Sequence, residues 1–278
     1  MTEKTLLSTL ERYYDTAPRA GGARAEDIGP LTLFVQEGAG WPYYARPLLD
    51  SRARADAPDV SVADVERVLA RQRELKVPES FEWVAETTPS LRAAVEAAGL
   101  HVHAHPLMVL DPAAASAGLP AAHPDVRVLG ADDALLGAAV TVPMLAFAAP
   151  GTAVGEAGPA ELAVAAQDPS VEPRRAMVSG MIASGRTVLA AAAQGGVVLC
   201  SGQYNPVDEV AEVVGVGTLP AARRRGLALA VTAALVSDAL AHGARTVFLS
   251  AGDEDVARIY GRLGFRRAGT ALIAEPPL

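Results

Sequence analysis

The hydrophobic positions in the second half of the chain alternate between strand and helix spacing. A strand-like apolar run, residues 213–219, ends at Pro220, and a helical pattern begins at Leu227 and stops at Gly243. The same reading predicts further strands at 125–129, 187–193, 196–204, 246–250 and 265–274, and further helices at 132–149, 160–166, 177–184 and 253–262. The predicted order after residue 125 is therefore strand, helices, strand pair, then strands alternating with helices.

The first half shows similar patterns. A helix is predicted over 61–76, with Ser61 as N-cap, and the polar segment 17–25 reads as a loop. Other elements are expected as helices at 3–15 and 89–98 and as strands at 31–36, 41–46, 81–86 and 102–110. Residues 111–124 are rich in Ala, Pro and Gly, which favours an interdomain connection. We therefore predict an N-terminal α/β domain at 1–115, a linker at 116–124 and a second domain at 125–278.

The amino-acid composition argues against several classes of protein. Half of the 278 residues are apolar and few are aromatic, which favours packed α/β layers. The formal net charge of −8 disfavours general binding to nucleic acid or anionic membranes. One cysteine excludes a disulfide framework, and no apolar run approaches the ~20 residues of a membrane span. Acidic residues interrupt the N-terminal apolar pattern, so no signal peptide is expected, and a cytoplasmic location is the default expectation.

The turn between the run ending at Pro220 and the helix from Leu227 reads Arg223-x-x-Gly226-x-Ala228. Backbone N–H groups of such a turn and the positive end of the helix dipole converge on one point, which suits a phosphate. Gly226 would let the backbone approach the anion without a Cβ in the way. Basic runs are more often only solvated, but a preceding strand and a following helix are the context that an anion site requires.

A second motif follows about thirty residues later: residues 256–265, VARIYGRLGF, contain Tyr260 and end in Gly-Phe. Together the two motifs resemble those of the GNAT superfamily of N-acetyltransferases, over about residues 125–275. The resemblance implies an α/β (α+β) fold with a mixed, mostly antiparallel central sheet flanked by helices. It also implies acetyl-CoA as co-substrate, direct acetyl transfer to an amine, and no metal.

The resemblance assigns cofactor contacts to backbone and side chains near the turn. Backbone groups of Val216 and Thr218 would pair with the pantetheine arm, and Gly215 and Gly217 fit a bulge that opens room for it. The pyrophosphate would bind the backbone N–H groups of the turn, with arginine side chains adding charge; the residues are Arg223, Arg224, Arg225, Gly226 and Ala228.

Two residues are candidates for proton transfer. Glu212 occupies the place where several GNAT enzymes carry a general base, which is needed because an amine pKa of about 10 leaves little neutral amine at pH 7. A structural, salt-bridged glutamate is an equal alternative, and Asp208 and Glu209 are other candidate bases. Tyr260 matches the tyrosine that protonates the leaving thiolate in many members; a hydrogen-bonded helix tyrosine is the alternative.

Three further positions need an interpretation. Asp253 stands where many members carry a cofactor-binding Asn, and its negative charge would be less welcome near phosphates. Cys200 is more readily a small buried apolar residue than a nucleophile. The three histidines of residues 101–105 alternate on one strand, but a solvated strand face explains them better than a metal site does.

The order of elements from 61 to 110 resembles the second half of a GNAT domain without its cofactor turn; the sequence before the helix is Ala57-Pro58-Asp59. An internal duplication with a degenerate N-terminal copy and an unrelated α/β cap both remain open. The acceptor is expected to be a small-molecule amine, in a pocket partly lined by the N-terminal region and the 145–160 loop. A non-catalytic acyl-CoA-binding regulatory module is the alternative function. Many GNAT proteins dimerise, so a homodimer is left open.

Overall fold

The computed structural model describes residues 2–38, 40–49 and 59–277. These form two compact units: unit 1 comprises residues 1–107 and 268–278, and unit 2 comprises residues 108–267. The division lies within two long strands, residues 101–110 and 265–275, rather than at the predicted linker, and the last part of the chain belongs to unit 1. Residues Ala57 and Pro58, where a cofactor turn of the first half was sought, lie outside the described residues.

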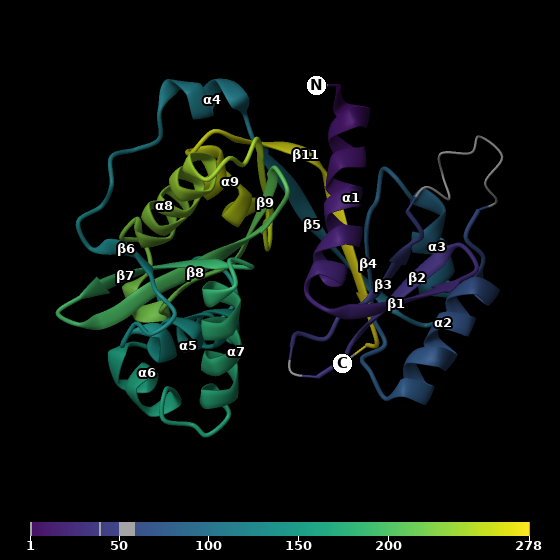
Figure 1. Cartoon of the computed structure of the whole chain (residues 1–278), viewed down its shortest axis with the longest axis horizontal. Helices are drawn as coiled ribbons and strands as arrows, with labels where there is room; N and C mark the ends of the chain where they lie inside the picture. Colours follow the sequence, from purple (N-terminus) through teal and green to yellow (C-terminus); the bar gives the residue numbers. More distant parts are fainter. Residues whose placement is uncertain (1, 39, 50–58, 278) are drawn as a thin grey trace. The chain divides into compact units, whose positions relative to one another are not determined.

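Unit 1 is a mixed α/β unit. Its elements are α1 (Glu3–Ala20), β1 (Ala23–Ile28), β2 (Leu31–Gln36), β3 (Ala45–Pro47), α2 (Val62–Leu75), β4 (Phe81–Val84), α3 (Pro89–Ala97), the first part of β5 (His101–Leu110) and the last part of β11 (Phe265–Glu275). Figure 1 shows them along the colour scale. The pairs β1–β2, β2–β3 and β4–β11 are antiparallel, and β3–β4 is parallel.

The start of unit 1 differs from the sequence prediction. The helix predicted at 3–15 continues through Pro18 to Ala20, where Arg19 pairs with Asp15 at 3.0 Å and its guanidinium stacks over the ring of Phe34. The expected loop at 17–25 is therefore wrong, and β1 was missed because its sequence, ARAEDI, is polar. A partly exposed strand needs no apolar face on its outer side, so it carries a weak hydrophobic signal.

The helix predicted over 61–76 is confirmed as α2, and its start is fixed by side chains. Ser61 Oγ accepts from the Asp64 N–H while the Asp64 carboxylate accepts from the Ser61 N–H at 2.8 Å, a complete capping box. Its buried stripe packs with α3 and the strands in one apolar cluster, which includes Leu33, Val65, Leu69, Trp83, Leu91 and Val95. Each fully buried side chain of this kind stabilises the fold by roughly 1.5–3 kcal/mol.

Unit 2 is a mostly antiparallel sheet with helices on both faces. Its elements are α4 (Pro112–Ala117), β6 (Val126–Leu129), α5 (Leu136–Phe147), α6 (Pro159–Ala165), α7 (Val171–Ala183), β7 (Val188–Gln194), β8 (Val197–Val207), β9 (Val210–Thr218), the 3-10 turn η1 (Pro220–Ala222), α8 (Leu227–Ala241), β10 (Thr246–Ser250), α9 (Glu254–Gly261) and the remaining parts of β5 and β11. The sheet order is β10-β9-β8-β7-β6, with only β9–β10 parallel among these pairs. The predicted fold class is confirmed.

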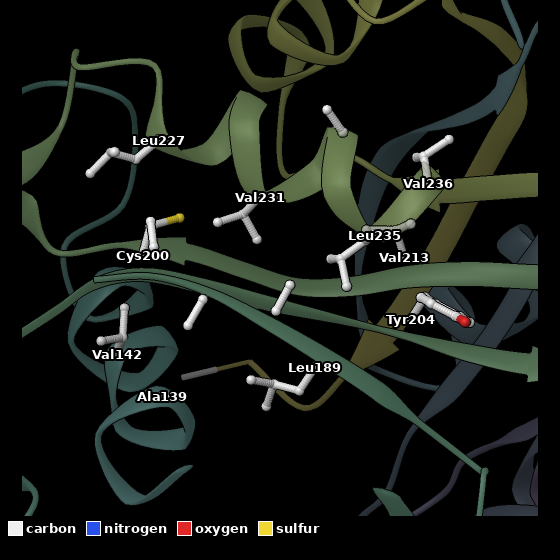
Figure 2. Packing of buried hydrophobic residues seen from close by; sticks show 14 of the residues in the cluster. Ala139, Val142, Leu189, Cys200, Tyr204, Val213, Leu227, Val231, Leu235 and Val236 are labelled. Carbon is white, nitrogen blue, oxygen red and sulfur yellow. The ribbon is translucent and has the colours of Figure 1, made fainter. Parts of the chain in front are cut away.

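The core of unit 2 lies on the two faces of β7–β9. Figure 2 shows Leu227, Val231 and Leu235 of α8 on one side of the strands and Ala139 and Val142 of α5 on the other. The α8 pattern is apolar nearly all round, which is expected of a helix buried against a sheet. No helix in the part of the chain that the structure describes is long and apolar enough to cross a membrane.

Candidate active site in unit 2

Strand β9 contains a bulge where the sequence predicted one. Cys200 pairs with Thr218 and Ser201 with Gly217, but Gln203 pairs with Val214, so β9 holds one residue more than β8 across this stretch. Gly215 has φ +64°, a left-handed conformation that favours glycine. The predicted bulge is therefore confirmed. It lies between the first part of β9, which contains Glu212, and the last part, which ends at Thr218.

Strands β9 and β10 pair only at their beginnings. The parallel register joins residues 210–212 to 246–248, whereas β9 continues to Thr218. Beyond Glu212, the described register gives the backbone of β9 no partner on the β10 side. Val216 and Thr218, the predicted pantetheine contacts, lie in this stretch, where an extended chain could be added as a strand.

The turn that follows β9 presents backbone donors. Arg224 has φ +65° and Gly226 has φ +78°, and α8 begins directly after Gly226. Among the described residues, the N–H groups of residues 224–229 donate no hydrogen bond; the first helical bond runs from Ala230 N–H to the Gly226 carbonyl at 3.0 Å. Unpaired donors at a helix N-terminus, aligned with the helix dipole, fit a pyrophosphate.

The three arginine side chains of this turn point to different partners. The Arg223 guanidinium bonds to backbone carbonyls of α5 and the following loop, and Arg225 Nη2 donates to Gln194 Oε1 at 2.5 Å. Arg224 is exposed, and the described residues offer its guanidinium no hydrogen bond. The sequence predicted that the side chains of all three arginines would add charge to the anion site. Only the Arg224 guanidinium has no hydrogen-bond partner among the described residues, so Arg224 is the best placed of the three to bind an anion.

The register places Glu212 on the face of the sheet that α5 covers. Ser201 Oγ donates to the Ala139 carbonyl of α5 at 2.6 Å, so odd-numbered residues of β8 face α5. Tyr204 faces the other way and donates to Asp238 of α8 at 2.7 Å. Glu212 pairs with Asn205, an odd-numbered residue, and therefore shares the α5 face.

Tyr260 lies on the opposite face, among buried groups. It is 7% exposed, its ring packs edge-on against Phe265 at 6.1 Å, and burial, together with the nearby Cys200 thiol, raises its phenol pKa above the ordinary value. A phenol is protonated at neutral pH with or without this shift, so Tyr260 can hold a proton to donate. Because Cys200 precedes Ser201 on β8 and so faces away from α5, the candidate base and the candidate acid lie on opposite faces of the sheet.

Neighbouring candidates have structural partners. Asp253 caps α9 by accepting from the Val256 N–H at 2.8 Å, and Glu209 pairs with Arg245 at 3.1 Å. Cys200 is fully buried beside the Thr218 hydroxyl, and burial raises the pKa of its thiol to about 12. The predicted burial of Cys200 is therefore confirmed. No group of three or more His, Cys, Asp or Glu side chains placed to hold a metal occurs among the described residues.

Sequence reasoning missed the partner segment of Arg223, residues 146–157. The contacts join residues about 70 positions apart in the sequence, and no local pattern announces such a pair. The only signal was the glycines of this loop: a Cβ on Gly155 would lie 3.0 Å from Pro220 Cβ, and one on Gly158 would lie 3.1 Å from Ala221 Cβ.

The site therefore combines three features: a parallel strand pair that separates, a bulge, and a left-handed turn that leads into a helix without a side-chain cap. In an α/β protein this arrangement suits binding of a phosphate group. The comparisons with known proteins agree. Residues 163–265 match the model of the acetyltransferase (GNAT) family. Residues 163–265 therefore carry a GNAT acetyltransferase domain, and the protein is an acyltransferase.

Solved structures extend the likeness of fold beyond this match. A GCN5-related N-acetyltransferase from Kribbella flavida is 23% identical, with 95% of each chain covered and a TM-score of 0.61. One from Sphaerobacter thermophilus is 15% identical over 90% of this chain and 78% of its own, with a TM-score of 0.55. A tandem GNAT protein from the clavulanic acid biosynthesis pathway is 15% identical over 88% and 77%, with a TM-score of 0.56. This coverage includes unit 1, so the likeness of fold extends over both units. A search of curated proteins found no match.

Proposed function

We propose that the protein is an acetyl-CoA-dependent N-acetyltransferase that acetylates an amine of a small molecule directly. The observation that carries the proposal is the turn at residues 224–229, whose N–H groups donate no hydrogen bond among the described residues and lie directly after the part of β9 that has left β10. Acetyl-CoA would supply the acetyl group as a thioester. Its pyrophosphate would lie on these N–H groups, near the guanidinium of Arg224, and its pantetheine arm along Val216 and Thr218.

The residues on the two faces would then divide the proton transfers. Glu212, directly or through water, would take a proton from the substrate ammonium on the α5 face, because only the neutral amine attacks a carbonyl carbon. The new C–N bond forms as the C–S bond breaks. Tyr260, whose phenol is protonated at neutral pH, would donate its proton to the leaving sulfur on the α9 face.

The test separates binding from turnover. Acetyl-CoA affinity is measured by calorimetry, and release of free CoA thiol is followed with a panel of small-molecule amines. Glu212→Gln should lower kcat/KM by about 100-fold or more while acetyl-CoA still binds, as loss of a general base does. Tyr260→Phe should lower kcat by about tenfold or more.

Two further variants make the assignment specific. Tyr204→Phe removes a phenol that only bonds Asp238 and should leave kcat within about twofold of wild type. Glu209→Gln tests the neighbouring carboxylate, and a loss equal to that of Glu212→Gln would move the base to Glu209. Wild-type protein that binds acetyl-CoA but acetylates no amine of the panel would contradict the proposed reaction.

A further inference from the structure

The Arg223 side chain bonds to three backbone carbonyls. Its Nη2 donates to the carbonyls of Ala146 at 2.8 Å and Ala149 at 2.6 Å, and its Nη1 donates to that of Ala153 at 3.0 Å. These carbonyls lie at the end of α5 and in the loop after it. The last carbonyls of a helix lack partners inside the helix and favour a cation, so a guanidinium is suited to this place.

Backbone contacts join the same two segments. The Gly155 N–H donates to the Pro220 carbonyl at 3.1 Å, and the Ala221 N–H donates to the Ala157 carbonyl at 3.0 Å. We call residues 146–157 the clamped segment. It is therefore tied to the cofactor turn by the Arg223 side chain and by the backbone of η1.

The clamped segment contributes little to the core. Phe147 is 61% exposed and Val154 is 60% exposed, so the largest apolar side chains of the segment stand in solvent. A charged side chain with three backbone acceptors thus orders a segment that buries little apolar surface. Core stability does not require this, because exposed apolar groups add little to folding free energy.

The clamped segment begins at the end of α5, the helix on the face of the sheet where Glu212 lies. Gly217 of β9 also meets this helix: a Cβ there would lie 2.9 Å from Pro143 Cα and 2.9 Å from Ala146 Cβ. The end of α5 is therefore packed directly on the strand that carries Glu212. The clamped segment thus follows the helix that covers the face of the sheet on which Glu212 lies, and it begins where that helix packs on the end of β9.

The neighbouring arginines provide an internal comparison. Arg225 reaches away from α5, to Gln194, which in turn donates to Asp125 Oδ2 at 2.7 Å. Arg224 is exposed and lies in the left-handed conformation within the turn. Only Arg223 of the three contacts the clamped segment among the described residues.

We propose that Arg223 is a positioning residue for the acceptor: it holds the clamped segment against the cofactor turn so that the segment can contact the acceptor amine. This inference rests on the proposed N-acetyltransferase function and adds a role that a phosphate-binding arginine would not have. Its signature is a selective effect on the acceptor, with little effect on acetyl-CoA.

The experiment uses full-length Arg223→Ala, Arg223→Lys and Arg225→Ala, with Arg127→Ala as control. Arg127 pairs with Asp133 near the start of α5, so its removal deletes an arginine ion pair elsewhere in unit 2. Three quantities are measured: the KM for the amine at saturating acetyl-CoA, the Kd of acetyl-CoA, and hydrogen exchange of the amides in residues 148–155.

Arg223→Ala should raise the amine KM about tenfold or more and leave the Kd of acetyl-CoA within about threefold, because several charge-assisted hydrogen bonds to one segment are lost. Exchange in residues 148–155 should become faster. Lysine can bond one of the carbonyls and should restore part of the loss. Arg127→Ala should leave both the amine KM and this exchange unchanged, and Arg225→Ala should leave this exchange unchanged because the Arg225 side chain bonds to Gln194.

The outcomes separate the inference from the function. If Arg223→Ala weakens acetyl-CoA binding and leaves the amine KM unchanged, Arg223 is a phosphate ligand and the proposal is wrong. Unchanged exchange in residues 148–155 in an active Arg223→Ala enzyme would also overturn it. If the wild-type protein acetylates no amine, the proposed function fails and this role fails with it, whatever the exchange shows.

Discussion

Among the strand pairs described above, each unit has a parallel pair joined through a helix, and the two helices begin in different ways. In unit 2, β9 and β10 flank α8, whose N-terminus follows Gly226 and has no side-chain cap. In unit 1, β3 and β4 flank α2, whose N-terminus is closed by the Ser61–Asp64 capping box. The carboxylate of Asp64 already occupies the place where an anion would bind α2. A shared order of elements therefore does not bring a shared site.

The strands themselves differ in the same sense. The open part of β9 offers backbone and glycine, whereas β3 carries Arg46, which is 1% exposed and donates to Glu11 Oε2 at 2.8 Å. The Arg46 guanidinium lies 4.6 Å from the ring centre of Tyr14. Burial opposes its charge, but the carboxylates of Glu11 and Glu82 help to hold the pKa of Arg46 above its ordinary value. The parallel pair of unit 1 therefore holds an internal ion pair, whereas that of unit 2 leaves backbone groups open.

The largest effect is expected from removing that arginine. Arg46→Met should destabilise unit 1 by about 3–5 kcal/mol, because it leaves buried carboxylates without their partner. Both tryptophans, Trp41 and Trp83, lie in unit 1, so urea unfolding followed by tryptophan fluorescence reports on this unit. Labelling of the buried Cys200 thiol reports on unit 2 in the same samples.

A matched control is Arg73→Met. Arg73 also pairs with a glutamate of unit 1, Glu79 at 2.7 Å, but is exposed, so solvent screens the pair and its loss should shift the unfolding midpoint far less than Arg46→Met does. If Arg46→Met costs no more than this control, the ion pairs do not hold unit 1 together and the contrast between the two strand pairs loses its meaning.

Blocking the turn of unit 2 should have the next largest effect. In Gly226→Val, a Cβ would meet no protein atom within 4 Å, but the residue must keep φ near +78° and would project from the N–H cradle. Acetyl-CoA binding should weaken by about 100-fold or more, since several hydrogen bonds to charged oxygens are lost together. Calorimetric titration measures this.

Gly243→Val supplies the control at the other end of α8. Gly243 has φ +96°, and a Cβ there also meets nothing within 4 Å, so the backbone strain is matched while the turn is intact. Both variants should lose a similar ~1–3 kcal/mol of stability. Equal losses of acetyl-CoA affinity in the two would mean that strain, and not the blocked turn, causes the effect.

These comparisons show what the sequence could and could not predict. Features set by local spacing were accessible: the turn at Arg223–Ala228, the bulge at Gly215 and the cap at Ser61 each depend on residues a few positions apart. Local chemistry fixes such features because the partners meet whatever the rest of the chain does.

Features set by distant contacts were not accessible. Arg46 and Glu11 are 35 positions apart, and Arg223 meets a carbonyl 77 positions away. The pairing of Ala271 with Val84 brings the last strand of the chain into unit 1, against the predicted boundary of the second domain. In the sequence the three arginines of the turn are equivalent, because nothing local distinguishes their partners. Only the structure shows that Arg223 and Arg225 bond to different segments.

The smallest expected effect concerns the pH dependence of unit 1, and it separates two glutamates by sign. Burial raises the pKa of Glu82 above its ordinary value of 4.5, although Arg46 opposes the shift. The folded state then holds the Glu82 proton more tightly than the unfolded state, so stability relative to Glu82→Gln should fall as pH rises from 4.5 through the raised pKa. For Glu26, the hydrogen bond from Arg71 lowers the pKa to about 2, so stability relative to Glu26→Gln should fall as pH drops from 4.5 toward 2. Urea unfolding followed by tryptophan fluorescence across this pH range measures both stability differences. Slopes of the same sign would show that Glu82 is solvated like a surface carboxylate. Unit 1 would then lack the buried charges that distinguish it from the open strand pair of unit 2.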